Sequence, residues 1–180
     1  MVVLKKILDF YINSSLHVAL SAFALVSMTQ YFFGVEGDFS VAFFAFFGTV
    51  VGYNFVKYDA IARLNKTEIK KELKAIVFLS FISLLACFYF FLQLSWMSKL
   101  SAVAFLGLTL LYTLPFFPNK QNARNWKGVK IYIVGITWVG VTVILPLVEA
   151  EIPFSMDVLL IAMQRFLLVF SIVLVFDIVD

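Results

Sequence analysis

Polar residues that could do chemistry gather at two places in an otherwise apolar chain. Asn54 and Asp59 follow one apolar run, and Asp177 and Asp180 follow another. Asp177 and Asp180 are three residues apart, so a helix carries both carboxylates on one face. Asn54 and Asp59 are five residues apart and converge only where a helix ends or bends between them. Carboxylate and amide oxygens suit Mg²⁺, which usually completes its coordination shell with water and substrate phosphates.

Basic residues accompany these acidic groups. Two of them follow Asn54, and two more stand at the start of the later apolar run that begins at Val129. Their positive charges could hold phosphate oxygens that a metal ion leaves free. The sequence therefore predicts a site for magnesium and a phosphate-bearing ligand, although the same residues could simply mark the boundary of a membrane. The predicted metal ligands are Asn54, Asp59, Asp177 and Asp180, and the predicted diphosphate ligands are Lys57, Arg63, Lys127 and Lys130.

Three further polar residues, Asn13, His17 and Ser21, repeat every fourth position. On a helix they share one face. The sequence slightly favours hydrogen bonds between helices for these residues, and the alternative is that they line a polar cavity shared with the acidic groups. His17 is the single histidine and has no partner at the spacing of a metal site, so no zinc site is expected.

The composition excludes most classes of protein. Hydrophobic residues make up 63% of the 180 residues and charged residues 14%, whereas soluble domains have about 45–50% and about 25%. No soluble fold of this size has enough interior for so much apolar surface. Cys87 is the single cysteine, so no intrachain disulfide can form, and its apolar neighbours predict a packing role. The remaining class is a polytopic membrane protein.

The apolar runs predict an all-α, multi-pass transmembrane helical bundle forming one domain over residues 1–180. A membrane-spanning helix needs about 20 mostly apolar residues, and the runs are too long for the alternating strands of an outer-membrane barrel. Arg165 lies inside the last run, where its side chain either reaches out to the membrane surface, which is slightly favoured, or faces the bundle interior. The six predicted spans are Ile12–Phe33, Phe39–Phe55, Ala75–Leu94, Leu100–Phe117, Val129–Val148 and Val158–Phe176.

The distribution of basic residues predicts the orientation of these spans. Twelve of the 14 Lys and Arg residues lie in or next to the N-terminus and the loops Val56–Lys74 and Pro118–Gly128. We expect that side to be cytoplasmic, in a cell (inner) membrane, and both acidic groups emerge on it. The net charge of +3 thus indicates topology and not a nucleic-acid partner. Membrane lipids are the expected surroundings of the spans.

Three features resemble the UbiA-type intramembrane prenyltransferases: Asn54 at the end of the second span, the basic loop that follows it, and Asp177-Ile178-Val179-Asp180 at the end of the sixth span. Asn54 matches the first family motif, N-D-x-x-D-x-x-x-D, and Asp177 and Asp180 match the first two positions of the second, D-x-x-D-x-x-x-D. The resemblance implies a bundle of about nine helices, so a chain with six would be incomplete at its C-terminus. It also implies Mg²⁺, a prenyl diphosphate, and transfer of the isoprenyl chain to an aromatic or lipid acceptor.

Two other functions remain open. The three aspartate positions of the first family motif fall on Phe55, Tyr58 and Ala62, which is typical of a catalytically degenerate paralogue that binds lipid or a partner without turnover. A small transporter would have spans broken by glycine or proline and charges that face a pore. The predicted spans are continuous and their charges cluster at one face, so the sequence favours the prenyltransferase.

Overall fold

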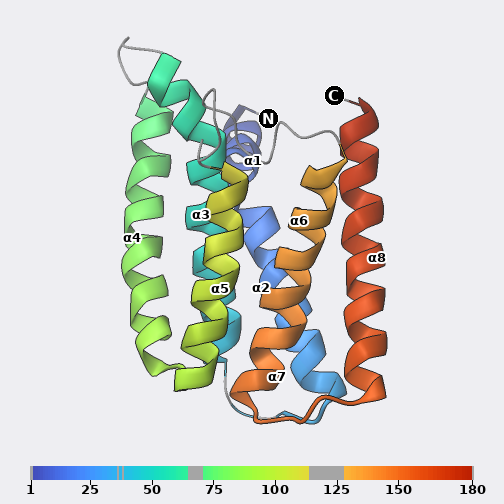
Figure 1. Ribbon diagram of the computed structural model, residues 1–180. Coiled ribbons are helices and arrows are strands. Elements are labelled where there is room, and N and C mark those ends of the chain that lie inside the picture. Colours follow the sequence, from blue (N-terminus) through green and yellow to red (C-terminus); the bar gives the residue numbers. More distant parts are fainter. Residues whose placement is uncertain (1, 36, 38, 65–70, 114–127, 180) are drawn as a thin grey trace. The chain divides into compact units, whose positions relative to one another are not determined.

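The computed structural model describes residues 2–35, 37, 39–64, 71–113 and 128–179, with all side chains in these ranges except those of residues 2, 59–64, 71–72 and 176–179. The described residues form helices joined by turns and contain no strand (Figure 1), which confirms the all-α prediction. They divide into two compact units. Unit 1 comprises Met1–Ser27 and Phe39–Gln93, and unit 2 comprises Met28–Asp38 and Leu94–Asp180.

Five helical segments in the described part of the chain are long and apolar enough to cross a membrane. They correspond to the second through sixth predicted spans, with boundaries that differ by a few residues, and residues 114–117 of the predicted fourth span lie outside the description. This correspondence supports the multi-pass membrane class, while a total of nine helices stays a prediction. The five segments are Ser40–Tyr58, Leu73–Gln93, Trp96–Thr113, Val129–Glu149 and Met156–Val175.

The first predicted span is broken in the structure. Instead of one run from Ile12, the chain forms α1 (Val2–Asn13) and α2 (Leu16–Phe32), whose axes differ by 60°. Ser15 has a φ of 60°, and its amide bonds the carbonyl of Ile12 at 3.2 Å, which closes the helix early. A residue in the left-handed conformation ends a helix. The predicted span ran through Asn13, Ser14 and Ser15, so its start was placed too early.

Unit 1 contains α1, most of α2, α3 (Ser40–Leu64) and α4 (Lys71–Gln93), and α3 packs antiparallel to α4 (Figure 1). Aromatic rings fill this contact, because the ring of Phe90 stacks on those of Phe43 and Phe47 at centroid distances of 5.3 and 6.0 Å. At Gly48 a Cβ atom would lie 3.6 Å from the Sγ of Cys87. Cys87 thus lies against α3, as expected for a packing role.

Unit 2 contains α5 (Trp96–Thr113), α6 (Val129–Val139), the π-helical segment η3 (Gly140–Ile144), α7 (Leu145–Glu149) and α8 (Met156–Val179). The segments α6, η3 and α7 follow one another without a gap and form one span. Antiparallel to them runs α8 (Figure 1). The core of this unit consists of the buried side chains of Val143, Leu147 and Val158, against which partly buried apolar residues pack.

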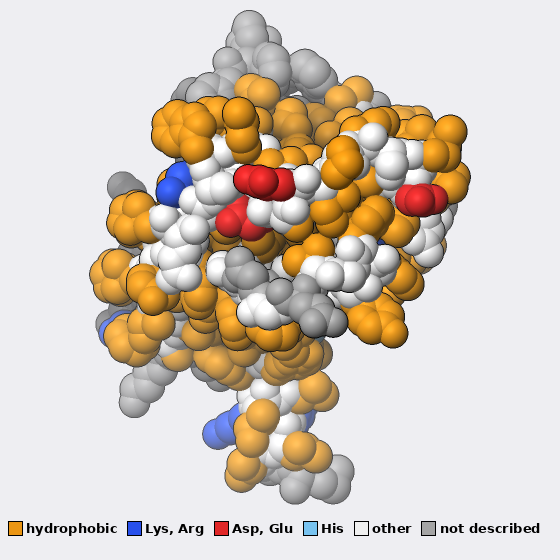
Figure 2. Space-filling model, turned by 90° about the horizontal axis from the view of Figure 1, so that it is seen from below, with side chains coloured by type: hydrophobic (Ala, Val, Ile, Leu, Met, Phe, Trp, Pro, Cys, Tyr) orange, Lys and Arg blue, Asp and Glu red, His pale blue; other side chains and the backbone are white. Residues whose placement is uncertain are grey.

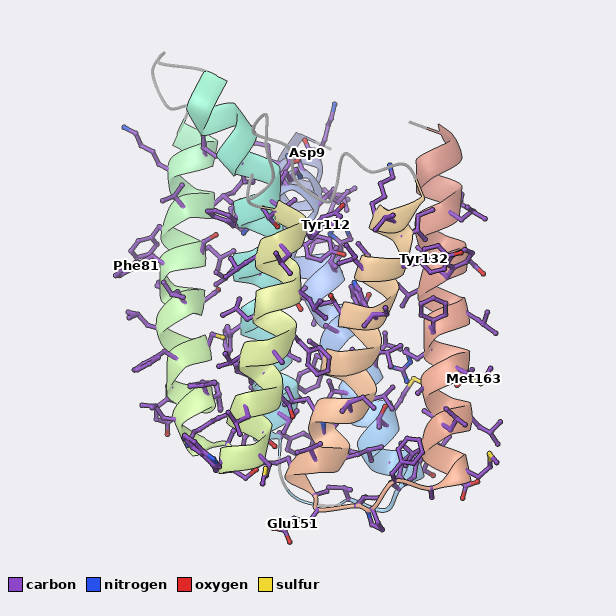
Figure 3. The ribbon with its side chains drawn as sticks, viewed as in Figure 1. Asp9, Phe81, Tyr112, Tyr132, Glu151 and Met163 are labelled. Atoms are coloured by element: carbon purple, nitrogen blue, oxygen red, sulfur yellow. The ribbon has the colours of Figure 1, made fainter. Side chains whose placement is uncertain are left out.

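Large hydrophobic side chains cover much of the surface (Figure 2). On α4 the side chain of Phe81 is 58% exposed, and on α8 that of Met163 is 55% exposed; both project away from their helices (Figure 3). Water would make such a surface unfavourable, at about 25 cal/mol for each Å² of apolar area. Hydrocarbon chains of a bilayer cover it without that cost, so the exposed faces agree with a multi-pass membrane protein.

Candidate functional site

Asn54 is the predicted metal ligand that the structure describes most fully. Its side chain is 3% exposed, and its Nδ2 donates a hydrogen bond to the Oγ of Ser80 at 2.9 Å. The Oγ of Ser80 in turn donates to the carbonyl of Ile76. The Oδ1 of Asn54 is buried and accepts no hydrogen bond from the described residues. A buried acceptor without a donor costs about 1–3 kcal/mol.

Asp59 lies on the same helix as Asn54, because α3 continues to Leu64 without a break. Five residues on a continuous helix correspond to a rotation of about 140°. The two side chains were expected to converge if the helix ended between them. The structure shows no helix end there. The side chains of Asp59 and Arg63 lie outside the described residues, so their roles as a metal ligand and a diphosphate ligand stay predictions.

The structure brings two predicted site residues together in an unexpected way. At the end of α1 the carbonyl of Asn13 accepts a hydrogen bond from the hydroxyl of Tyr58 at 2.8 Å. The Nζ of Lys57 lies 3.4 Å from both this carbonyl and the Oδ1 of Asn13. The last carbonyls of a helix lack partners within the helix, so Lys57 and Tyr58 satisfy the end of α1. The sequence signal for this contact was the serine pair that follows Asn13, which predicts a helix end.

His17 and Ser21 are exposed, as is Asn13. The hydroxyl of Ser21 donates to the carbonyl of His17 at 3.0 Å, within its own helix. The imidazole ring of His17 lies 5.8 Å from the ring of Tyr11, measured between centroids. None of these residues lines the pocket described next. A polar cavity lined by the three therefore stays a prediction.

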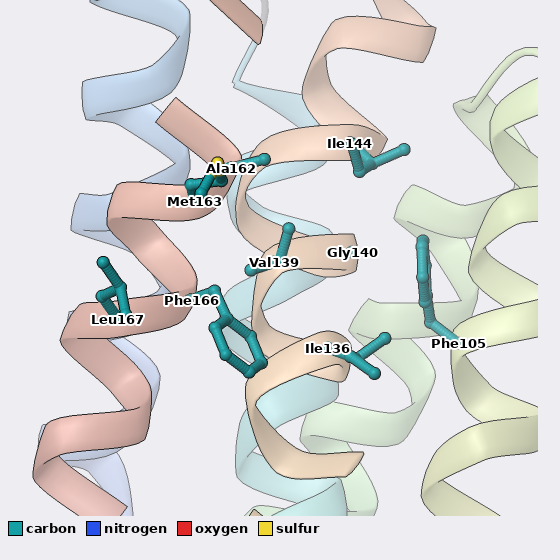
Figure 4. A pocket seen from close by; sticks show the side chains of 9 residues that line it. All are labelled: Phe105, Ile136, Val139, Gly140, Ile144, Ala162, Met163, Phe166 and Leu167. Atoms are coloured by element: carbon teal, nitrogen blue, oxygen red, sulfur yellow. The ribbon is translucent and has the colours of Figure 1, made fainter. Parts of the chain in front are cut away.

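An apolar pocket of about 460 Å³ lies within unit 2 (Figure 4). Two glycines, which lack a Cβ atom, leave space for aromatic rings that line the pocket. A Cβ atom at Gly140 would lie 2.1 Å from the ring of Phe105, and a Cβ atom at Gly135 would lie 2.8 Å from the ring of Phe166. The lining carries almost no polar surface and comes from α5, α6, η3 and α8, through Phe105, Ile136, Val139, Gly140, Ile144, Ala162, Met163, Phe166 and Leu167.

Two predicted site residues stand beyond one end of this pocket. Lys130 is in the first turn of α6, and Asp177 is in the last turn of α8. Because α6 and α8 are antiparallel neighbours, these two turns lie at the same end of unit 2 (Figure 1). At 1.5 Å rise per residue, Lys130 lies about 9 Å along its helix from Ile136 and Asp177 about 15 Å from Leu167. The side chain of Asp177, and all of Lys127 and Asp180, lie outside the described residues.

Arg165 shows where sequence reasoning failed. Its side chain is 2% exposed, so the favoured outward orientation is wrong and the residue faces the interior of unit 2. Its Nη2 lies 3.5 Å from the Oγ1 of Thr29, which donates to the carbonyl of Thr142 at 2.7 Å. Arg165 lies about 14 Å along α8 from its first residue, Met156, and α8 continues beyond it to Val179. An arginine side chain that deep is better satisfied by polar neighbours than by the membrane surface.

The described residues do not form a magnesium site. They contain no group of three or more His, Cys, Asp or Glu side chains that could hold a metal ion. Among the four predicted ligands, Asn54 alone has a described side chain. One neutral amide oxygen is too weak a ligand set for Mg²⁺, which is usually held by one or two carboxylates together with phosphate and water.

Comparison with known protein families, with curated proteins and with solved structures finds no match for this chain. The resemblance to the UbiA-type enzymes consequently depends on the order of the spans and on Asn54, Asp177 and Asp180. The class that the helices themselves define is a multi-pass membrane protein with an apolar pocket in one of its two units.

Proposed function

We propose that this protein is an intramembrane prenyltransferase that holds the isoprenyl chain of a prenyl diphosphate in the pocket of unit 2. The observation that supports the proposal is an almost wholly apolar pocket between helices that place Lys130 and Asp177 at one shared end. An isoprenyl chain is pure hydrocarbon and matches such a lining. The diphosphate would extend toward Lys130, whose ammonium group offsets part of its negative charge.

The reaction that fits this arrangement breaks the bond between C1 of the prenyl group and the diphosphate oxygen. The electron pair leaves with the diphosphate, and Lys130 stabilises the charge that develops there. A new bond forms between C1 and a carbon or oxygen of the acceptor, which releases a proton. The pocket excludes water from the allylic cation, and the rings of Phe105 and Phe166, which line it, favour positive charge.

Titration of geranylgeranyl diphosphate into the purified full-length chain tests the proposal. Ala162→Phe fills the pocket from α8, and we expect it to weaken binding at least tenfold. The control is Leu160→Phe, because Leu160 is on the same helix but is an exposed residue outside the pocket. Binding by the Ala162→Phe variant that equals the parent would exclude the pocket as the isoprenyl site.

The same titration tests the dependence on Mg²⁺ that the resemblance implies. We expect EDTA and Asp177→Asn to weaken binding in the same direction, whereas Asp157→Asn, at the opposite end of α8, should leave it unchanged. Binding that resists EDTA, together with no transfer to any aromatic acceptor, would favour the lipid-binding paralogue. The observation that speaks for this second function is that the three aspartate positions of the first family motif fall on Phe55, Tyr58 and Ala62.

A further inference from the structure

The helix α1 has two chemically different sides. Positions 5, 6, 9 and 13 carry Lys, Lys, Asp and Asn, and their spacing of three and four residues gathers them on one side. The other side carries Val3, Leu4, Ile7, Leu8 and Tyr11. The first two are 71% and 73% exposed, and Ile7 is 62% exposed. This apolar side therefore packs against no other part of the described chain to any large extent.

The end of α1 lies at the level where a neighbouring span ends. The hydroxyl of Tyr58 donates a hydrogen bond to the carbonyl of Asn13, and Tyr58 follows Lys57, the first charged residue of α3. A charged residue after an uncharged apolar run indicates the edge of the hydrocarbon layer for α3. Tyrosine is enriched at this level because its ring is apolar and its hydroxyl is polar. The C-terminal end of α1 therefore lies at the membrane boundary.

The direction of α1 differs from that of the helix that follows it. Its axis is bent by 60° from that of α2. If α2 follows the bilayer normal, α1 rises only about 30° from the membrane plane. Its 12 residues are also about 18 Å long, too short for a hydrocarbon layer about 30 Å thick. The hydrogen bonds from Lys57 and Tyr58 to Asn13 fix its C-terminal end.

We propose that α1 is an interfacial helix that lies on the bilayer in which the spans are embedded, on a leaflet with anionic lipids. The apolar side enters the boundary between headgroups and acyl chains, as is usual for amphipathic helices of this type. Lys5 and Lys6 flank the polar side and complement phosphate groups of anionic lipids. Asp9, between them and Asn13 in the sequence, is exposed (Figure 3). This inference is independent of the prenyltransferase proposal.

Cysteine labelling of the full chain in vesicles tests the inference. A Cys87→Ala background leaves one label at Ile7→Cys, on the apolar side, or at Asp9→Cys, its matched control on the polar side of the same turn. The vesicles contain about 30% phosphatidylglycerol, and an environment-sensitive fluorophore reports on each position. We expect a shallow spin-labelled lipid to quench the label at position 7 at least threefold more than the label at position 9. Aqueous iodide should show the reverse order.

A second pair of variants tests the charges. Lys5→Glu with Lys6→Glu should reduce the lipid quenching at position 7 at least twofold, whereas Lys99→Glu, elsewhere in the chain, should not. Equal iodide quenching at positions 7 and 9 would overturn the proposal. A second result would also overturn the proposal. If neither quencher reached the label at position 7, and the label quenched itself as the protein-to-lipid ratio rose, a second copy of the chain would cover α1.

Discussion

Thr29 joins two buried groups of unit 2 through a single hydroxyl. Its Oγ1 donates to the carbonyl of Thr142 in the π-helical segment and lies 3.5 Å from the guanidinium of Arg165. The hydroxyl of Thr142 itself bonds the carbonyl of Trp138. Such π-helical turns disturb the regular hydrogen bonding of a helix and are frequent at functional sites. The arginine in the middle of α8 is therefore tied to the irregular turn through Thr29.

Thr29→Val should lower the free energy of unfolding by about 1 kcal/mol, in the range of measured hydrogen bonds between membrane helices. The reason is that Val keeps the shape but leaves the carbonyl of Thr142 without the described donor. Denaturation by SDS in mixed micelles measures the change. Thr109→Val is the matched control, since the hydroxyl of Thr109 bonds only the carbonyl four residues earlier in its own helix, and it should change stability by less than half as much. Equal losses for both variants would contradict a role specific to Thr29.

At the scale of elements, the space between α5 and the α6–η3–α7 span depends on one missing side chain. The ring of Phe105 occupies the place that a Cβ atom at Gly140 would take. The two helices can therefore approach with an aromatic ring between them, and that ring forms one wall of the pocket. Close approach at small residues is a main source of packing energy in membranes, where hydrocarbon surrounds every helix.

Gly140→Ala should displace the ring of Phe105 and cost about 1–3 kcal/mol, as overpacking usually does. Because Phe105 lines the pocket, the affinity for geranylgeranyl diphosphate should also change. Gly107→Ala on α5 is the control, because a Cβ atom there meets nothing within 4 Å. SDS denaturation and ligand titration, run on both variants, measure the two effects. If Gly140→Ala were as stable as the parent and bound the ligand equally well, the contact would have no role in shaping the pocket.

At the scale of the whole molecule, three spans separate the start of α4 from the turn between α7 and α8. An odd number of crossings places the two segments on opposite sides of the membrane. The basic residues around the loop Val56–Lys74 predict that the α4 side is cytoplasmic. The segment around Glu151 (Figure 3) would then face the outside.

Glu151→Cys should therefore react with a membrane-impermeant maleimide added to intact cells, and Lys74→Cys should react after lysis only. Both positions are exposed in the structure, and the Cys87→Ala background removes the natural thiol. Mass spectrometry of the purified chain measures the labelled fraction. The opposite pattern would reverse the predicted orientation, and equal labelling at both positions would contradict three intervening spans.

The sequence by itself predicted which segments are long and apolar enough to cross a membrane. The length of a span depends on a fixed rise per residue and on the thickness of the hydrocarbon layer, and both act within a single segment. Five predicted spans consequently match helices of the structure within a few residues. The approach of Cys87 to α3 also agreed with prediction, because the residue lies in a continuous apolar run.

Only the tertiary structure decided which polar groups meet. Arg165 faces the interior because Thr29, 136 residues earlier in the chain, stands beside it. The hydrogen bond from Tyr58 to Asn13 likewise joins residues 45 positions apart in the chain. Hydropathy treats each residue by itself, whereas the cost of burying a polar group depends on the partner it finds. For that reason the spans could be predicted from composition and length, and the orientation of side chains within them could not.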